Sequence, residues 1–129
     1  MSDAPLIPVS WGEAIDKLTI LEIKSARLIG ESALTNVRKE LSTLADVSRP
    51  VLAAHPDVAA IAAELKTING ELWDIEDSIR AKETAGSFDG EFISLARSVY
   101  KKNDERAKLK KRINIALSSS LMEEKSYKS

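Results

Sequence analysis

Cysteine is absent from this chain of 129 residues, and histidine occurs only once, at position 55. Without cysteine there is no disulfide framework, no thiolate nucleophile and no cysteine-ligated zinc site. A single imidazole also excludes metal centres that are built on several histidines. We therefore expect a protein that holds no metal ion and no cofactor.

Long apolar runs and an excess of one charge are also lacking. No stretch approaches roughly 18 consecutive apolar residues, and residues 1–9 lack the basic and apolar segments of a secretion signal. The net charge of -1 provides no overall field that would attract nucleic acid or an acidic membrane. A basic stretch at 101–112 is interrupted by acids and has no interleaved aromatics. We expect a cytoplasmic protein with no membrane partner, and the pattern disfavours nucleic acid.

Glycine and proline are scarce, and apolar residues recur at spacings of three and four, which is typical of amphipathic helices. Ser10 precedes Glu13 by three residues, the capping-box spacing that opens a helix, and Asp57 is a candidate N-cap. Pro50 and Pro56 bracket an expected irregular link. The sequence predicts an all-α bundle of four helices near 10–29, 32–47, 57–84 and 90–118. These form one domain over 1–129, with an extended N-terminal arm at 1–9 and a C-terminal tail at 119–129.

The third and fourth helices are predicted to form a long antiparallel, coiled-coil-like hairpin. The third carries a heptad-like seam, and Gly86 to Gly90 form a short connection that forces the next helix to run back. Residues should then face each other where their numbers sum to about 174. This pairing sets Ile75 near Val99, Leu65 near Leu109 and Ile61 near Ile113.

The seam is interrupted by Lys102, Asn103 and Arg106, where apolar residues are expected. A guanidinium inside a helix interface requires carboxylates and hydrogen-bond acceptors around it. We expect Glu71 or Asn69 to be its first partner, with Asn103 completing the hydrogen bonds and Asp16 or Glu22 contributing. Such a layer either fixes the register of the helices or forms a pocket in which Arg106, with Arg80, Arg97 or Lys24, binds an anionic small molecule.

A second polar cluster surrounds Trp73 on the third helix, where Trp73, Asp77 and Arg80 share one face and Glu76 and Arg80 an overlapping one. These residues could form local ion pairs, with Trp73 packed on Arg80. Alternatively, they line a groove against the first helix, with Trp73 as its apolar wall. The two clusters together define a candidate binding pocket: Lys24, Glu71, Trp73, Glu76, Arg80, Arg97, Tyr100, Asn103 and Arg106.

Two enzyme classes are compatible with parts of this pattern. Glu71 and Asp74 form an ExxD pair, as in all-α nucleotide pyrophosphatases, but no second carboxylate pair has suitable spacing. Residues 13–28 faintly resemble the first helix of all-α chorismate mutases, which clamp carboxylates with basic side chains. Gly12 and Glu13, however, stand where that class has an arginine. Catalytic residues therefore remain unassigned.

Three strings together resemble a known family: GEAIDKLTILEIKSARL, NGELWDIEDSIR and FISLARSVYKKNDERAKLKKRIN, followed by EEKSY in the tail. They are similar to a small bacterial family described only as a domain of unknown function, number six-one-six-five. The resemblance spans Ser10 to Tyr127 and implies a stand-alone, soluble bacterial protein, without implying an activity. Its association with surface-polysaccharide gene neighbourhoods gives context rather than mechanism.

The first helix carries an apolar stripe that is wider than one face of a bundle requires. Together with the lack of residues for nucleophilic or metal chemistry, this favours a binding or assembly module that forms a homodimer. The alternative is a small-molecule enzyme or binder that acts on an anionic metabolite through the candidate pocket.

Overall fold

The computed structural model describes residues 4–118, which form four α-helices and, within this range, no strand. The helices are α1 (Trp11–Arg27), α2 (Glu31–Ala54), α3 (Pro56–Ala85) and α4 (Gly90–Ala116). The predicted all-α fold is therefore confirmed. The expected tail at 119–129 lies outside the described residues.

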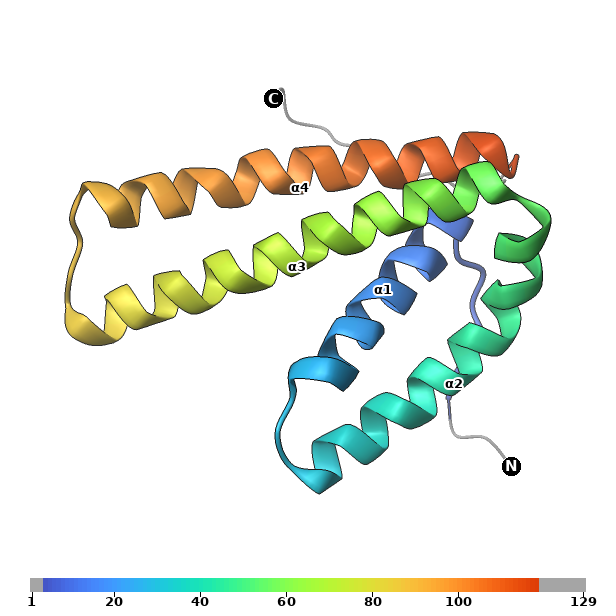
Figure 1. The fold of residues 1–129 in the computed structure, drawn as a ribbon, viewed down its shortest axis with the longest axis horizontal. Coiled ribbons are helices and arrows are strands. Elements are labelled where there is room, and N and C mark those ends of the chain that lie inside the picture. The colour runs from blue at the N-terminus through green and yellow to red at the C-terminus, as the bar shows by residue number, and fades with distance from the viewer. Residues whose placement is uncertain (1–3, 119–129) are drawn as a thin grey trace.

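The helices are arranged as two hairpins of unequal length (Figure 1). The longer hairpin consists of α3 and α4, and α1 and α2 lie beside the half of it that contains the start of α3 and the end of α4. We call this four-helix part the base. The remainder of the long hairpin, residues 70–108, contacts α1 at its root and otherwise extends beyond α1 and α2, and we call it the distal hairpin.

Side-chain and glycine caps fix the helix ends that the sequence predicts. The Ser10 hydroxyl accepts a hydrogen bond from the backbone N–H of Glu13 at 3.1 Å, which confirms the start of the first helix. At the tip of the distal hairpin, Gly86 ends α3 in the left-handed conformation, with φ at 66°. Asp89 then caps α4 by accepting from the N–H of Phe92 at 3.0 Å.

The link expected between Pro50 and Pro56 is wrong. Helix α2 continues through Pro50 to Ala54, and His55 alone separates it from α3. An interior proline removes one helical hydrogen bond and usually costs about 3 kcal/mol. Here α2 is anchored on both sides of that point, because Ser48 is fully buried and Leu52 packs against the core. The N-cap of α3 is accordingly His55 and not Asp57.

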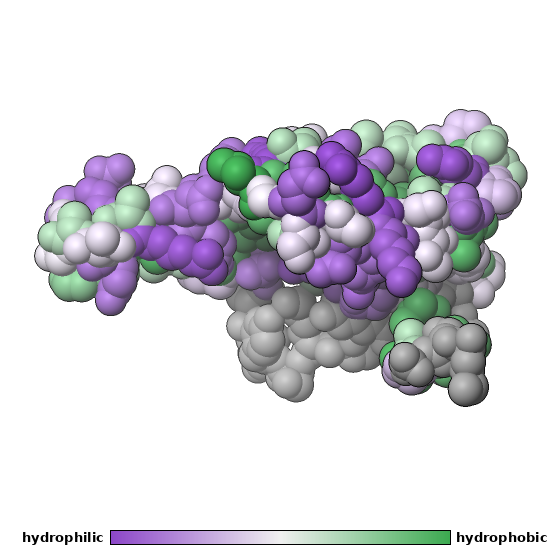
Figure 2. Space-filling view, turned by 90° about the horizontal axis from the view of Figure 1, so that it is seen from below, coloured by the Kyte–Doolittle hydropathy of each residue, from purple (hydrophilic) through white to green (hydrophobic). Residues whose placement is uncertain are grey.

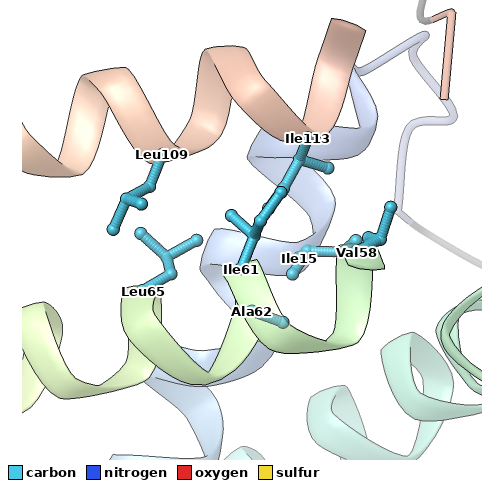
Figure 3. Packing of buried hydrophobic residues seen from close by; sticks show 7 residues of the cluster. All are labelled: Ile15, Val58, Ile61, Ala62, Leu65, Leu109 and Ile113. Atoms are coloured by element: carbon cyan, nitrogen blue, oxygen red, sulfur yellow. The ribbon is translucent and has the colours of Figure 1, made fainter. Parts of the chain in front are cut away.

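The apolar core lies in the base, where α1, α3 and α4 meet (Figure 3). Leu65 faces Leu109 and Ile61 lies beside Ile113, which confirms the predicted antiparallel register at this end of the hairpin. Trp11, Leu52, Ile68 and Leu117 pack around the cluster. Its buried members are Ile15, Val58, Ile61, Ala62, Leu65, Leu109 and Ile113.

Helix α1 is the central element of the base and packs against α2, α3 and α4. Its wide apolar stripe is therefore used within one chain, so the stripe does not by itself require a second copy. The approach to α4 is closest at Gly12, whose N–H donates to the side-chain oxygen of Asn114 at 2.6 Å. A β-carbon at this position would lie 2.5 Å from the backbone oxygen of Lys110, which leaves room only for glycine.

The distal hairpin differs from the base in its burial. None of residues 70–108 is buried, although Ile75, Ile79, Leu95 and Val99 continue the apolar seam and are half-buried there. In the space-filling view this hairpin is a narrow projection with a largely hydrophilic surface (Figure 2). Two helices alone therefore leave the seam partly open to water.

Candidate functional site

The centre of the site is an ion pair between α1 and α4. Asp16 lies on the inner face of α1 and is only 3% exposed. Its two carboxylate oxygens accept from Nε and Nη2 of Arg106 at 2.9 and 2.5 Å. This fork-to-fork geometry is the strongest form of guanidinium–carboxylate pairing. Because the Arg106 side chain is 28% exposed, the guanidinium lies at the edge of the interface rather than deep inside it.

Three further polar side chains complete a network across α1, α3 and α4. The amide nitrogen of Asn69, on α3, donates to the Asp16 carboxylate and to the Thr19 hydroxyl, each at 2.9 Å. Thr19 in turn donates to the backbone oxygen of Asp16 at 2.8 Å. On α4, the side-chain oxygen of Asn103 accepts from Nη1 of Arg106 at 3.4 Å. The network holds one positive and one negative charge and has no net charge of its own.

The partner predicted first for Arg106 is wrong in part. Asn69 joins the network through Asp16, while Glu71 pairs with Lys102 at 2.5 Å. That hydrogen bond raises the pKa of Lys102 above its usual value. Asp16, expected only as a contributor, is the carboxylate that holds Arg106. Asn103 contacts Arg106 as expected.

A pocket of about 270 Å³ opens beside the network, between the second half of α1 and the start of the distal hairpin. Four of the nine predicted pocket residues line it, namely Trp73, Glu76, Asn103 and Arg106. Sequence reasoning identified Trp73 as an apolar wall but not the aliphatic walls. The remaining lining residues are Ile20, Ile23, Asn69 and Leu72.

The other predicted residues lie outside this lining. Arg80, Arg97 and Tyr100 are exposed on the distal hairpin, and Lys24 is half-buried on α1. The basic side chains expected to assist Arg106 therefore do not converge with it on the pocket.

Trp73 is held by α1 rather than by its own helix. The guanidinium of Arg27 lies 5.8 Å from the centre of the Trp73 ring, and it also pairs with Asp74 at 2.6 Å. The expected packing of Trp73 on Arg80 is replaced by this contact, which joins α1 to α3 across the mouth of the pocket. Glu76 has no ion-pair partner among residues 4–118.

The carboxylates that the pyrophosphatase pattern would use are engaged elsewhere. Glu71 pairs with Lys102 of α4 and Asp74 with Arg27 of α1, so different helices engage the two carboxylates of the ExxD pair. Within the described range, no three carboxylate or histidine groups approach one another closely enough to hold a metal ion. The described residues therefore do not provide the paired carboxylates that this pattern requires.

Opposite charges on the two helices of the long hairpin form ion pairs across it. Lys102 pairs with Glu71, and Arg112 pairs with Glu64 at 3.3 Å. Both pairs are substantially exposed, so each contributes at most about 1 kcal/mol. No described helix has the length and apolar content needed to cross a membrane.

Comparisons with known proteins give one match. The model of a family described as a family of unknown function, DUF6165, matches residues 6–129. Neither the curated proteins nor the solved structures contain a match to this chain.

Proposed function

The chain belongs to the DUF6165 family of unknown function, and from its own geometry we propose that it is an assembly module that forms a homodimer through its distal hairpin. The observation that carries this proposal is the absence of any buried residue between 70 and 108. Most helical stability in proteins comes from packing of an apolar face rather than from helix propensity. A further helical layer would therefore bury the half-open seam of this projecting pair of helices and increase its stability.

Three large apolar side chains are exposed on the distal hairpin. Ile93 is 56% exposed and Tyr100 is 53% exposed, and their spacing of seven residues places them on one face of α4. Phe88, at the tip, is also exposed and packs edge-on against Phe92. Large exposed apolar groups on one element are typical of an interaction surface.

The distribution of charge favours a second copy of this chain as the occupant. The outer face of α4 carries a row of four basic residues, and none of them has an ion-pair partner in the described part of the chain. These residues are Arg97, Lys101, Lys108 and Lys111. On α3, Asp77 and Glu83 are exposed and equally unpaired within that part. The acids lie toward the tip of the hairpin and most of the bases toward the base.

An antiparallel pair of distal hairpins would match these charges twice. The acidic tip of each copy would lie beside the basic root of the other, as a two-fold symmetric interface requires. Electrostatic complementarity of this kind selects the partner and sets the register. The same contact would cover the half-open seam and produce a four-helix arrangement from two hairpins.

Sedimentation equilibrium at micromolar concentration tests this proposal. We expect a species of twice the 14.1 kDa chain mass. Reversal of two bases, Arg97→Glu with Lys101→Glu, should raise the dimer dissociation constant by about tenfold or more. Adding Asp77→Lys and Glu83→Lys should restore association, because the pattern of complementary charges is then re-established with opposite sign.

A matched control reverses two exposed bases on α2, Arg38→Glu with Lys39→Glu, and should leave the dissociation constant unchanged. A monomer at all accessible concentrations would contradict the proposal. Equal weakening by the α2 control would also contradict it, since the effect would then reflect total charge rather than the distal hairpin.

A further inference from the structure

The pocket next to Arg106 has an unexpected charge balance. Both carboxylate oxygens of Asp16 bind Arg106, so the one guanidinium that lines the pocket is already neutralised. The other charged lining residue is Glu76, which has no ion-pair partner among residues 4–118. The uncompensated charge at the pocket is therefore negative.

We propose that this pocket binds a small organic cation, an alkylammonium group that carries a short apolar chain. The ammonium would be held by the Glu76 carboxylate, and the chain would lie against the apolar walls. Ile20 and Ile23 of α1, which is not part of the proposed dimer contact, form one side of the pocket, and its other side lies at the root of the distal hairpin. The sequence suggested an anionic ligand, but Glu76 would repel an anion and Asp16 competes for the guanidinium.

The polar groups of the pocket suit an ammonium. An ammonium donates three hydrogen bonds and accepts none, so its site must supply acceptors. Glu76 provides a carboxylate, and the side-chain oxygen of Asn103 accepts only a long bond of 3.4 Å from Arg106, which leaves a lone pair available. Both groups line the same pocket.

The apolar groups of the pocket suit the rest of the ligand. Ile20, Ile23 and Leu72 provide aliphatic surface, and the indole of Trp73 provides an aromatic wall. The Trp73 ring already attracts one cation, since Arg27 lies 5.8 Å from its centre. The volume of about 270 Å³ is below the usual range for drug-sized ligands, which limits the ligand to a small amine.

Three probes of similar size and different charge separate the effect of ligand charge on binding from the effect of ligand shape. We would titrate the protein with n-butylamine, n-butanol and butyrate at neutral pH and follow the Trp73 indole N–H and the side-chain amides of Asn69 and Asn103 by NMR. We expect n-butylammonium to give saturable shifts of these three groups at about millimolar concentration, and to bind more tightly than the other two probes.

Two variants that each remove one negative charge sharpen the test. Glu76→Gln removes the proposed acceptor charge and should weaken butylammonium binding by about tenfold, the usual scale of a charge-assisted hydrogen bond. Glu31→Gln makes the same change in net charge at an exposed position of α2, outside the pocket lining and outside the proposed dimer contact, and should change the affinity by less than about twofold.

Three outcomes would overturn the proposal. The first is tighter binding of butyrate than of butylammonium, and the second is no saturation with any probe. The third is an equal loss in the two variants, which would indicate a general attraction of cations to the acidic side chains of the protein.

Discussion

The base and the distal hairpin have the same helical pattern but different packing. In the base, α1 and α2 cover α3 and α4, and Leu65 and Ile113 are completely buried. In the distal hairpin the same seam continues through Ile75 and Val99, which stay half-buried because no third helix reaches them. A heptad pattern therefore determines which residues face the partner helix, whereas full burial also depends on a second layer.

The polar contacts of the two parts also differ in their exposure to water. A network around Asp16 joins the base to the root of the distal hairpin, and the Asp16 side chain is only 4% exposed. The distal hairpin is closed instead by exposed contacts at its tip, where Lys82 pairs with Asp89 and Glu91 at 2.9 and 3.1 Å. Removing one partner is costly only in the shielded case.

The largest expected difference concerns the apolar seam itself. Leu65→Ala should lower the free energy of unfolding by about 3 to 4 kcal/mol, because it opens a cavity in a fully buried cluster. Ile79→Ala, at a half-buried position of the same seam, should cost about 1 kcal/mol. Urea denaturation measures both changes. A dependence of the Ile79→Ala cost on protein concentration would support burial of the distal hairpin in a dimer, whereas equal costs would erase the distinction between the two parts.

The next largest effect separates the shielded ion pair from an exposed one. Arg106→Met should lower the free energy of unfolding by about 3 kcal/mol, because it leaves the Asp16 carboxylate buried and without its ion-pair partner. The double variant with Arg106→Met and Asp16→Asn should lose clearly less free energy of unfolding than the sum of the losses in the two single variants. A double-mutant cycle on Lys102 and Glu71, an exposed pair, should give a coupling below about 1 kcal/mol. Similar coupling in the two cycles would mean that water reaches Asp16.

Local pattern was sufficient to predict the four helices, the cap at Ser10, the short connection that begins at Gly86, and the pairing of Leu65 with Leu109. Each follows from spacing within one helix or from a connection of a few residues. The course of α2 through Pro50 was not predictable in this way, because packing on both sides of the proline outweighs the local cost of a missing N–H.

The partners of the site could be predicted only in part. Spacing shows which face of α1 is apolar, but it does not show which helix covers that face. Asp16 and Arg106 are 90 residues apart, and no local rule relates them. A signal was nevertheless present: Asp16 and Thr19 lie within the wide apolar stripe of α1, where polar side chains require internal partners.

Replacing two helical glycines by alanine should change the stability by smaller amounts, and the two changes should have opposite signs. Gly12→Ala should destabilise the protein by about 2 kcal/mol, because the added β-carbon would press on the backbone of α4 in the base. Gly70→Ala, at the start of the distal hairpin, should stabilise it by about 0.5 to 1 kcal/mol. Its β-carbon would meet only Arg27, at an ordinary 3.7 Å. Thermal unfolding of the two variants measures the sign of each change in stability. A loss of stability in Gly70→Ala would contradict the open packing described for the distal hairpin.

The smallest expected effect is a local response to acid at the tip of the distal hairpin. The backbone N–H of Phe92, followed by the ammonium of Lys82, lowers the pKa of Asp89 from 3.8 to about 2. The folded-state pKa lies below the unfolded one, so the contribution of this cap is complete above about pH 4 and is lost as the pH falls through about 2. The Phe92 amide resonance should therefore show a transition with a midpoint near pH 2. At the start of α1 the cap is a hydroxyl, that of Ser10, so the Glu13 amide should lack this transition. Asp89→Asn retains a capping side chain without a titrating carboxyl and should abolish the Phe92 transition. If the transition persists in that variant, another acid controls the tip, and the assignment of the cap to Asp89 fails.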